Sequence, residues 1–188
     1  MNVTVFKCLM CNDCCFFSNE GESPIVLPDE KRLLLREAIR FNIKPESLTF
    51  KPYEVYNVRD TNVEAYIVLS YRWIIRGYCP FYNMEERKCL IHKVKPLSCS
   101  MFPLILNVTF NLVHVSDRCR WVRENLDLIL RSNPKDVFPY EIKCLIEAFT
   151  RIHRFTTLLK SKFKTIRRID VDNLPSNVKL VDIDQVLP

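Results

Sequence analysis

Four cysteines within eight residues constrain this chain more than any other feature. The octet reads Cys8-Leu-Met-Cys11-Asn-Asp-Cys14-Cys15. Thiolates spaced two residues apart converge on one point, and such soft ligands suit a zinc ion or an iron–sulfur cluster. If the octet is helical, Cys8, Cys11 and Cys15 share one face. Adjacent thiols do not easily reach one tetrahedral ion together, so Cys14 and Cys15 indicate two metal centres, or one ligand beside a supporting thiol.

Several enzyme and cofactor classes are excluded by simple spacing. The bacterial ferredoxin run needs its fourth cysteine at position 18, where this chain has Ser18. The spacing of the radical-SAM proteins, begun at Cys11, fails at the same serine. Gly21 and Gly77 are the only glycines. Phosphate-binding loops of the Walker and Rossmann types need several glycines, so the usual nucleotide chemistries are excluded.

Four further cysteines complete the candidate ligand set. Cys79 and Cys89 flank a polar segment that reads as a hairpin, so both side chains can point to one side of it. Cys99 lies between two prolines that stiffen the backbone, which suits a preorganised ligand. Cys119 opens a predicted helix, whose N-terminus favours a thiolate. The predicted metal ligands are Cys8, Cys11, Cys14, Cys15, Cys79, Cys89, Cys99 and Cys119.

Two other residues with ligand chemistry receive different interpretations. His92 follows Cys89 by three residues and is a candidate nitrogen ligand. With eight thiols available, an exposed or hydrogen-bonded histidine is the simpler interpretation. Cys144 lies among apolar residues at helical spacing, and we interpret it as a core thiol.

Composition favours a cytosolic metal protein over a secreted disulfide protein. A chain of 188 residues buries roughly 70% of its unfolded surface and needs no disulfides to fold. The start, MNVTVFKCLMCNDCC, lacks the pattern of a secretory signal. No apolar run approaches the roughly 20 residues of a membrane span, so we expect a cytoplasmic protein without membrane contact.

Apolar periodicity predicts an α+β fold. We expect a cysteine-cluster metal-binding domain with a few β-strands at residues 1–121, followed by a helical C-terminal extension at 122–188. That extension should pack on the first domain and end in an extended tail. The predicted elements are a helix at 28–42, strands within 52–75, a hairpin at 79–90, a bent strand at 104–115, and helices at 119–131 and 140–163.

Positive charge is concentrated in one run near the C-terminus. The run from Arg151 to Arg168 holds seven Lys or Arg and no acidic residue. A solvated helix face explains such a run, and contact with nucleic acid or another acidic partner is the alternative.

The motifs together resemble a known family. CLMCNDCC, followed by GYCPFYNMEERKCLIHKVKPLSCSMFP, resembles the CxxCxxCC family of zinc- or iron-chelating proteins over residues 6–121. This chain departs at Lys95 and Ser100, where the family usually has arginine, and at His92, where it has tyrosine. Arg120 and Trp121 stand where Pro-Gly often follows the last cysteine. Lysine keeps the charge of arginine but loses its bidentate fork.

Three functions follow from these observations. The first is a metal-binding protein that holds an iron–sulfur cluster or zinc, and we favour the cluster because the adjacent pair suits a multinuclear centre. The second is a protein-lysine methyltransferase, which the resemblance permits because the family includes the flagellin lysine N-methylases. The third is a metal-stabilised module that binds nucleic acid or protein. The sequence identifies no catalytic residue.

Overall fold

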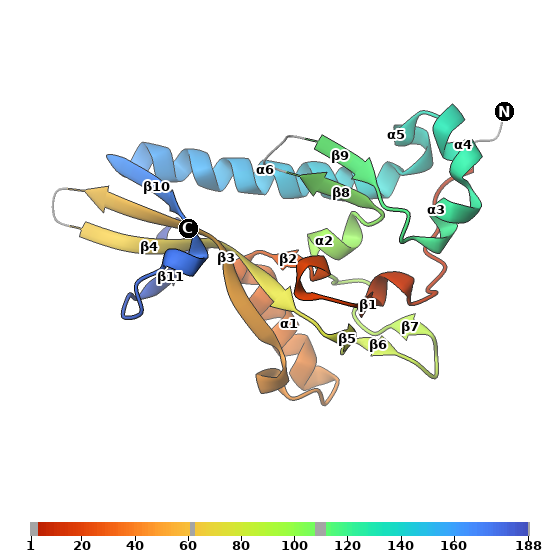
Figure 1. Ribbon diagram of the computed structural model, residues 1–188, viewed down its shortest axis with the longest axis horizontal. Coiled ribbons are helices and arrows are strands. Elements are labelled where there is room, and N and C mark those ends of the chain that lie inside the picture. Colours follow the sequence, from red (N-terminus) through yellow and green to blue (C-terminus); the bar gives the residue numbers. More distant parts are fainter. Residues whose placement is uncertain (1–3, 61–62, 108–111, 188) are drawn as a thin grey trace. The chain divides into compact units, whose positions relative to one another are not determined.

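The fold of the chain is α+β, as the sequence predicts. A computed structural model describes residues 4–60, 63–107 and 112–187 (Figure 1). Contacts divide the chain into two compact units. We call residues 1–22 with 76–149 the cysteine unit, and residues 23–75 with 150–188 the sheet unit. The division expected at residue 121, between a cysteine-cluster domain and a helical extension, stays a prediction.

A long antiparallel pair organises the sheet unit. Strands β3 (Thr49–Asp60) and β4 (Val63–Ile74) fall within or beside the stretch predicted as strands. They pair from Thr49↔Ile74 to Asp60↔Val63, with irregular register near Pro52 and Glu54. The stretch is rich in β-branched residues, which favour strands. The side chains of Val55, Val58, Ile67 and Val68 are fully buried.

Short strands extend this sheet on both sides (Figure 1). Strand β10 (Thr165–Ile169) pairs antiparallel with β3. Strand β4 pairs with β2 (Ile25–Val26) antiparallel and with β11 (Leu180–Asp182) parallel. The tail therefore does more than extend, since it completes the sheet and continues into the short helix α7 (Ile183–Val186).

Helices supply the rest of the sheet unit's core. Helix α1 (Pro28–Arg40) confirms the predicted helix and begins where the Leu27 N–H donates to Glu30 Oε2 at 2.8 Å. The long helix α6 (Pro139–Lys162) has its last residues in this unit. There Leu159 packs with Val58, Ile67 and Ile183 in a fully buried cluster. Short 3₁₀ turns, η3 (Pro45–Ser47) and η4 (Val171–Asn173), complete the unit.

The cysteine unit consists of small elements. Its turns and strands are η1 (Asp13–Cys15), β1 (Phe16–Phe17), η2 (Glu20–Glu22), β5 (Gly77–Tyr78), β6 (Tyr82–Asn83), β7 (Lys88–Cys89), β8 (Leu104–Asn107) and β9 (Leu112–Val115). Its helices are α2 (Leu97–Ser100), α3 (Arg120–Glu124), α4 (Leu126–Arg131), α5 (Pro134–Val137) and the first part of α6. A buried core joins β8 to α3 and α5. Its residues are Leu104, Cys119, Trp121, Val122, Val137 and Phe138.

Two predicted elements differ from what the structure contains. The bent strand predicted at 104–115 is two strands, because β8 and β9 pair antiparallel from Leu104↔Val115 to Asn107↔Leu112. Residues 108–111, between them, lie outside the described residues. The helix predicted from Cys119 is two helices that meet at Asn125, whose Nδ2 donates to the Trp121 carbonyl at 2.8 Å. Such a side-chain bond competes with the helical pattern.

Crossing a membrane would require a longer apolar helix than any that the described residues form.

Candidate metal centre

The octet folds as a loop that ends in a 3₁₀ turn, so the condition under which Cys8, Cys11 and Cys15 would share a helical face is not met. Met10 and Asn12 have positive φ angles of 50° and 66°, which interrupt a right-handed helix before η1. The turn places the sulfurs of Cys14 and Cys15 at 3.9 Å from each other. Adjacent side chains thus point the same way closely enough for their thiols to interact.

An aromatic anchor holds the chain just before the octet. The ring of Phe6 packs edge-on against Trp121 at 5.2 Å and lies 5.6 Å from the ring of Phe138. The Phe6 N–H also donates to the Val137 carbonyl at 2.7 Å. Burial of aromatic surface is the dominant source of stability in such a small core. The approach to Cys8 is therefore set by the helical part of the cysteine unit.

A strand pair holds the chain just after the octet. Phe16 pairs with Tyr78, and their rings meet edge-on at 5.0 Å. The Cys79 N–H donates to the Cys15 carbonyl at 2.7 Å. Gly77 has a φ of 79°, a conformation that few other residues adopt, so this glycine turns the chain toward Cys79. The pairing brings together two candidate ligands that are far apart in the sequence.

The hairpin that carries Cys89 also supports the octet. Strands β6 and β7 confirm the predicted hairpin, and Tyr82 pairs with Cys89 across it. The hydroxyl of Tyr82 donates to the Met10 carbonyl at 2.8 Å, within the octet. Tyr82 is 8% exposed, so its ring is fixed by packing. One side chain thereby links the Cys89 hairpin to the loop between Cys8 and Cys11.

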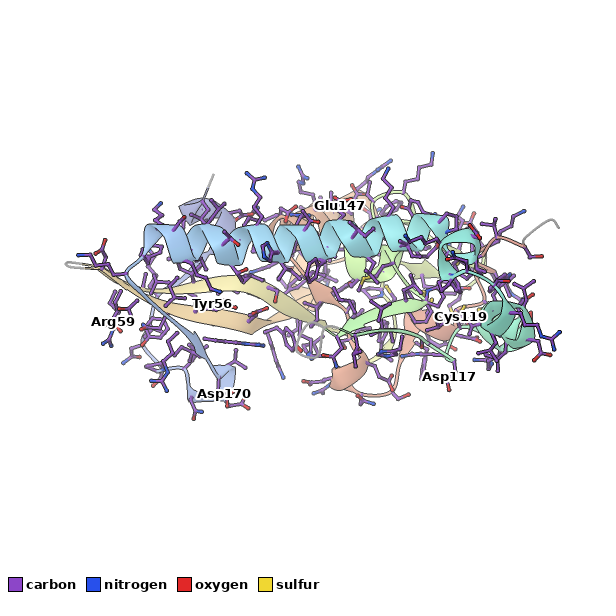
Figure 2. All side chains as sticks on the ribbon, turned by 90° about the horizontal axis from the view of Figure 1, so that it is seen from above. Tyr56, Arg59, Asp117, Cys119, Glu147 and Asp170 are labelled. Carbon is purple, nitrogen blue, oxygen red and sulfur yellow. The ribbon has the colours of Figure 1, made fainter. Side chains whose placement is uncertain are left out.

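The remaining two candidate ligands belong to other elements. Cys99 lies in α2, where its N–H donates to the Pro96 carbonyl at 3.0 Å. Cys119 is the residue before α3 and is 8% exposed (Figure 2). The arginines on either side of it, Arg118 and Arg120, donate hydrogen bonds to Asp13 of the octet.

The candidate ligands influence the pKa values of one another's thiols. Burial raises the pKa of Cys8, Cys79, Cys89 and Cys119, and the neighbouring Cys14 raises each of them further. The hydrogen bond with Cys15, followed by burial, raises the pKa of Cys14 well above the ordinary value of a thiol. These thiols are therefore protonated at neutral pH in the absence of metal, and each must lose its proton to become a ligand.

Two polar groups stand beside the thiols. The ammonium of Lys95 acts against burial and lowers the pKa of Cys8, Cys14 and Cys89. Ser98 Oγ, adjacent to Cys99, is buried without a hydrogen-bond partner among the described residues. A buried hydroxyl in that state is available to donate to a sulfur.

The donor set fits a soft metal in chemistry, although the thiols do not surround a single point. None of the nine cysteines forms a disulfide, and the eight candidates belong to the cysteine unit. The 3.9 Å between the Cys14 and Cys15 sulfurs is close to the edge, about 3.8 Å, of a tetrahedron of thiolates around zinc. Across residues 4–60, 63–107 and 112–187, however, no three Cys, His, Asp or Glu side chains converge as an ion would require.

The structure shows the environments of two other residues with ligand chemistry, His92 and Cys144. His92 is exposed in the turn after β7, which agrees with its interpretation as an exposed histidine. Cys144 is 5% exposed within α6, and burial raises the pKa of its thiol. That environment agrees with a core thiol.

The basic run is partly neutralised where the structure places it. It is divided between the end of α6 and β10. Arg151 pairs with Asp29 at 2.6 Å, and Arg168 lies 3.9 Å from Glu54. Within the part of the chain that is described, the structure adds no support for a nucleic-acid or acidic partner at this run.

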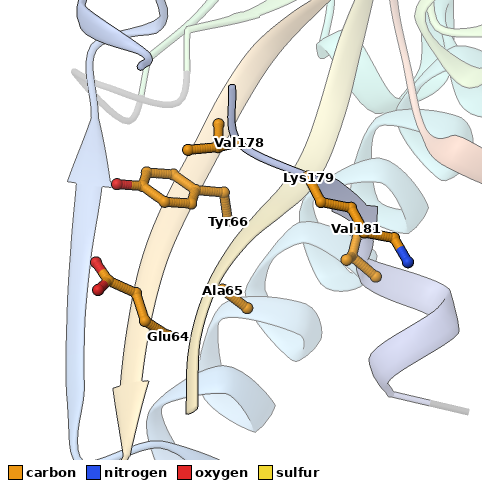
Figure 3. A pocket seen from close by; sticks show the side chains of 6 residues that line it. All are labelled: Glu64, Ala65, Tyr66, Val178, Lys179 and Val181. Atoms are coloured by element: carbon orange, nitrogen blue, oxygen red, sulfur yellow. The ribbon is translucent and has the colours of Figure 1, made fainter. Parts of the chain in front are cut away.

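A pocket in the sheet unit contains none of the candidate metal ligands. Its lining is Glu64, Ala65, Tyr66, Val178, Lys179 and Val181 (Figure 3). Hydrogen bonds from Asn57 and Arg59 hold the pKa of Glu64 below its ordinary value, so this carboxylate is already engaged. All six residues belong to the sheet unit, whereas every candidate ligand belongs to the cysteine unit.

Comparison with known proteins gives one match. Residues 7–125 match the model of the family CxxCxxCC, described as "Putative zinc- or iron-chelating domain". The match covers the octet and the other four candidate ligands. No curated protein and no solved structure matches the chain significantly.

Proposed function

Because the chain belongs to the CxxCxxCC family of zinc- or iron-chelating domains, we propose that its eight candidate cysteines hold a metal centre, an iron–sulfur cluster rather than a single zinc ion. The observation that carries this proposal is that eight thiols outside any disulfide gather in one unit, where Cys14 acts electrostatically on four others. A cytosolic location is part of the proposal and is supported only by the sequence.

The number of thiols favours a centre with more than one metal ion. A structural zinc ion takes four ligands, and the unit offers twice that number. The adjacency of Cys14 and Cys15 does not distinguish a cluster from a single zinc ion, because a sulfur–sulfur separation of 3.9 Å also suits two thiolates on one tetrahedral ion. The preference for a cluster therefore rests on the count of thiols.

The residues of the chain would prepare the site in defined ways. Cys79, Cys89, Cys99 and Cys119 would meet the octet from a strand end, a hairpin, a helix and a helix start. Tyr82 orients the loop between Cys8 and Cys11 through its bond to Met10. A bound centre supplies a cross-link between these segments, which otherwise depend on short elements.

Metal and sulfide analysis after anaerobic purification tests the proposal. We expect iron and acid-labile sulfide in the wild-type protein, with visible absorption that Cys14→Ser reduces sharply. Cys144→Ser is the matched control, because it removes a thiol from the same unit without removing a candidate ligand. A colourless protein with zinc and no sulfide would overturn the cluster, and wild-type metal content in Cys14→Ser would overturn the assignment of Cys14.

The methyltransferase and the nucleic-acid-binding module stay predictions. No observation in the described residues favours either over metal binding, so neither is developed as a second candidate.

A further inference from the structure

We propose that Asp13 is a positioning residue, which docks the octet onto the segment around Cys119 before any metal binds. This inference rests on the proposed function, because it concerns how two groups of candidate ligands are brought together. No sequence motif assigns a role to Asp13, and Arg120 stands out in the sequence only as a departure from the family pattern.

The side chain of Asp13 is shared between two arginines. Its carboxylate accepts hydrogen bonds from Arg120 Nε at 3.3 Å and Nη2 at 2.9 Å, and from Arg123 Nη2 at 2.9 Å. The carboxylate side chain is 19% exposed, so these bonds are partly shielded from water. Burial alone would raise the pKa of Asp13, but the bonds from Arg120 and Arg123 hold it below its ordinary value.

The backbone of Asp13 is engaged by a third arginine. Arg118 Nε donates to the Asp13 carbonyl at 3.0 Å, and Arg118 Nη1 donates to Glu22 at 3.0 Å. Its guanidinium also lies 5.2 Å from the centre of the Phe17 ring. Arg118 thereby contacts the octet itself and the chain that follows it.

The arginines are held to the turn that carries Cys119. Arg123 Nη1 donates to the carbonyls of Asp117 and Arg118, each at 2.9 Å, and the Arg123 N–H donates to the Cys119 carbonyl at 3.1 Å. Asp117 and Cys119 lie close together at this turn (Figure 2). An arginine fixed at its own turn loses less freedom when it binds a carboxylate.

The contacts join neighbours of candidate ligands. Asp13 directly precedes Cys14, while Arg118 and Arg120 flank Cys119. Asp13 and Arg120 are 107 residues apart in the chain. Closing so long a loop has an entropic cost that metal binding would otherwise have to overcome. The Asp13 contacts, together with the packing of Phe6 on Trp121, close it without a metal, so Cys119 is already placed when an ion arrives.

Cobalt(II) binding to Asp13→Asn tests the proposal, because thiolate-to-cobalt absorption reports the number of thiolate ligands. We expect cobalt to bind about tenfold more weakly, since the variant loses charge-assisted bonds of a partly exposed network. Its absorption should fall to the level of Cys119→Ser. Asp29→Asn is the matched control, because it breaks the Asp29–Arg151 pair of 2.6 Å in the sheet unit and should match the wild type.

Two further measurements separate positioning from general destabilisation. In the metal-free protein, alkylation of Cys119 should be faster in Asp13→Asn than in the wild type or Asp29→Asn. Arg120→Gln should behave like Asp13→Asn, and the double variant should be little worse than either, as expected of a shared interaction. If Asp13→Asn fails to fold, Arg120→Gln alone carries both measurements.

The results also distinguish this inference from the proposed function. Wild-type affinity, wild-type absorption and unchanged alkylation in the variants would overturn the role of Asp13 while leaving metal binding intact. A wild-type protein without thiolate-to-cobalt absorption would overturn the metal centre, whereas the alkylation rates would still decide whether Asp13 docks the two segments.

Discussion

Removal of the Tyr82 hydroxyl should lower the free energy of unfolding of the cysteine unit by an amount that the structure allows us to calculate. In Tyr82→Phe the ring stays in place, and only the hydrogen bond to the Met10 carbonyl, 2.8 Å long, is lost. The bond is only partly buried, so water can pair with the Met10 carbonyl once the hydroxyl is removed. The cost should therefore be the net value of one hydrogen bond, about 1 kcal/mol in the free energy of unfolding. If the metal-bound form keeps the bond, both forms lose it equally, and metal affinity should stay unchanged.

Urea unfolding followed by tryptophan fluorescence measures this loss. Trp121 lies in the cysteine unit and Trp73 in the sheet unit, so a Trp73→Phe background makes the signal report on the unit that contains Tyr82. Tyr78→Phe is the matched control, because Tyr78 is 47% exposed and adjacent to Cys79. No change in Tyr82→Phe would refute the bond, and a loss above about 3 kcal/mol would mean that the ring, not the hydroxyl, was disturbed.

Three more predictions concern other parts of the cysteine unit. Removal of metal by chelation or mild acid should expose the first 22 residues to protease before the rest, because thiolate ligands must stay deprotonated; identical cleavage patterns would contradict a metal cross-link. Burial raises the pKa of Glu141 above 4.5, so its contribution favours the fold below that pH and is lost as pH rises through the folded-state pKa. Glu141→Gln should therefore raise the melting temperature at pH 7 and not at pH 4, and a lower melting temperature at pH 7 would show that its charge is stabilising. Ser98→Ala should stabilise the metal-free protein by up to about 1 kcal/mol, since it removes an unpaired buried hydroxyl, and destabilisation in calorimetry would show that the hydroxyl has a partner.

Local patterns were predicted well because their causes are local. Helix α1 has a proline at its start, acidic residues in its first turn and an apolar stripe, all within 13 residues. The hairpin at β6 and β7 follows from polar residues between two short apolar runs. The family could likewise be inferred, because the order and spacing of cysteines are properties of the sequence.

The course of the octet could not be predicted in the same way. Its spacing suited a helix, yet the positive φ angles at Met10 and Asn12 accompany contacts to distant residues such as Tyr82. The role proposed for Asp13 was missed for a related reason. An aspartate beside cysteines has the pattern of a solvated residue, and no local signal indicates arginines more than 100 residues away.

The sequence by itself determined which soft donor groups this protein carries, namely eight thiols in a recognisable order. Only the tertiary structure decided which segments carry those thiols toward one another, through the Phe16–Tyr78 pair, the Tyr82 hydroxyl and the arginines around Asp13. The physical reason is that ligand type is a property of each residue, whereas convergence depends on loop closure across about 100 residues. The short elements of the cysteine unit supply that closure through specific contacts.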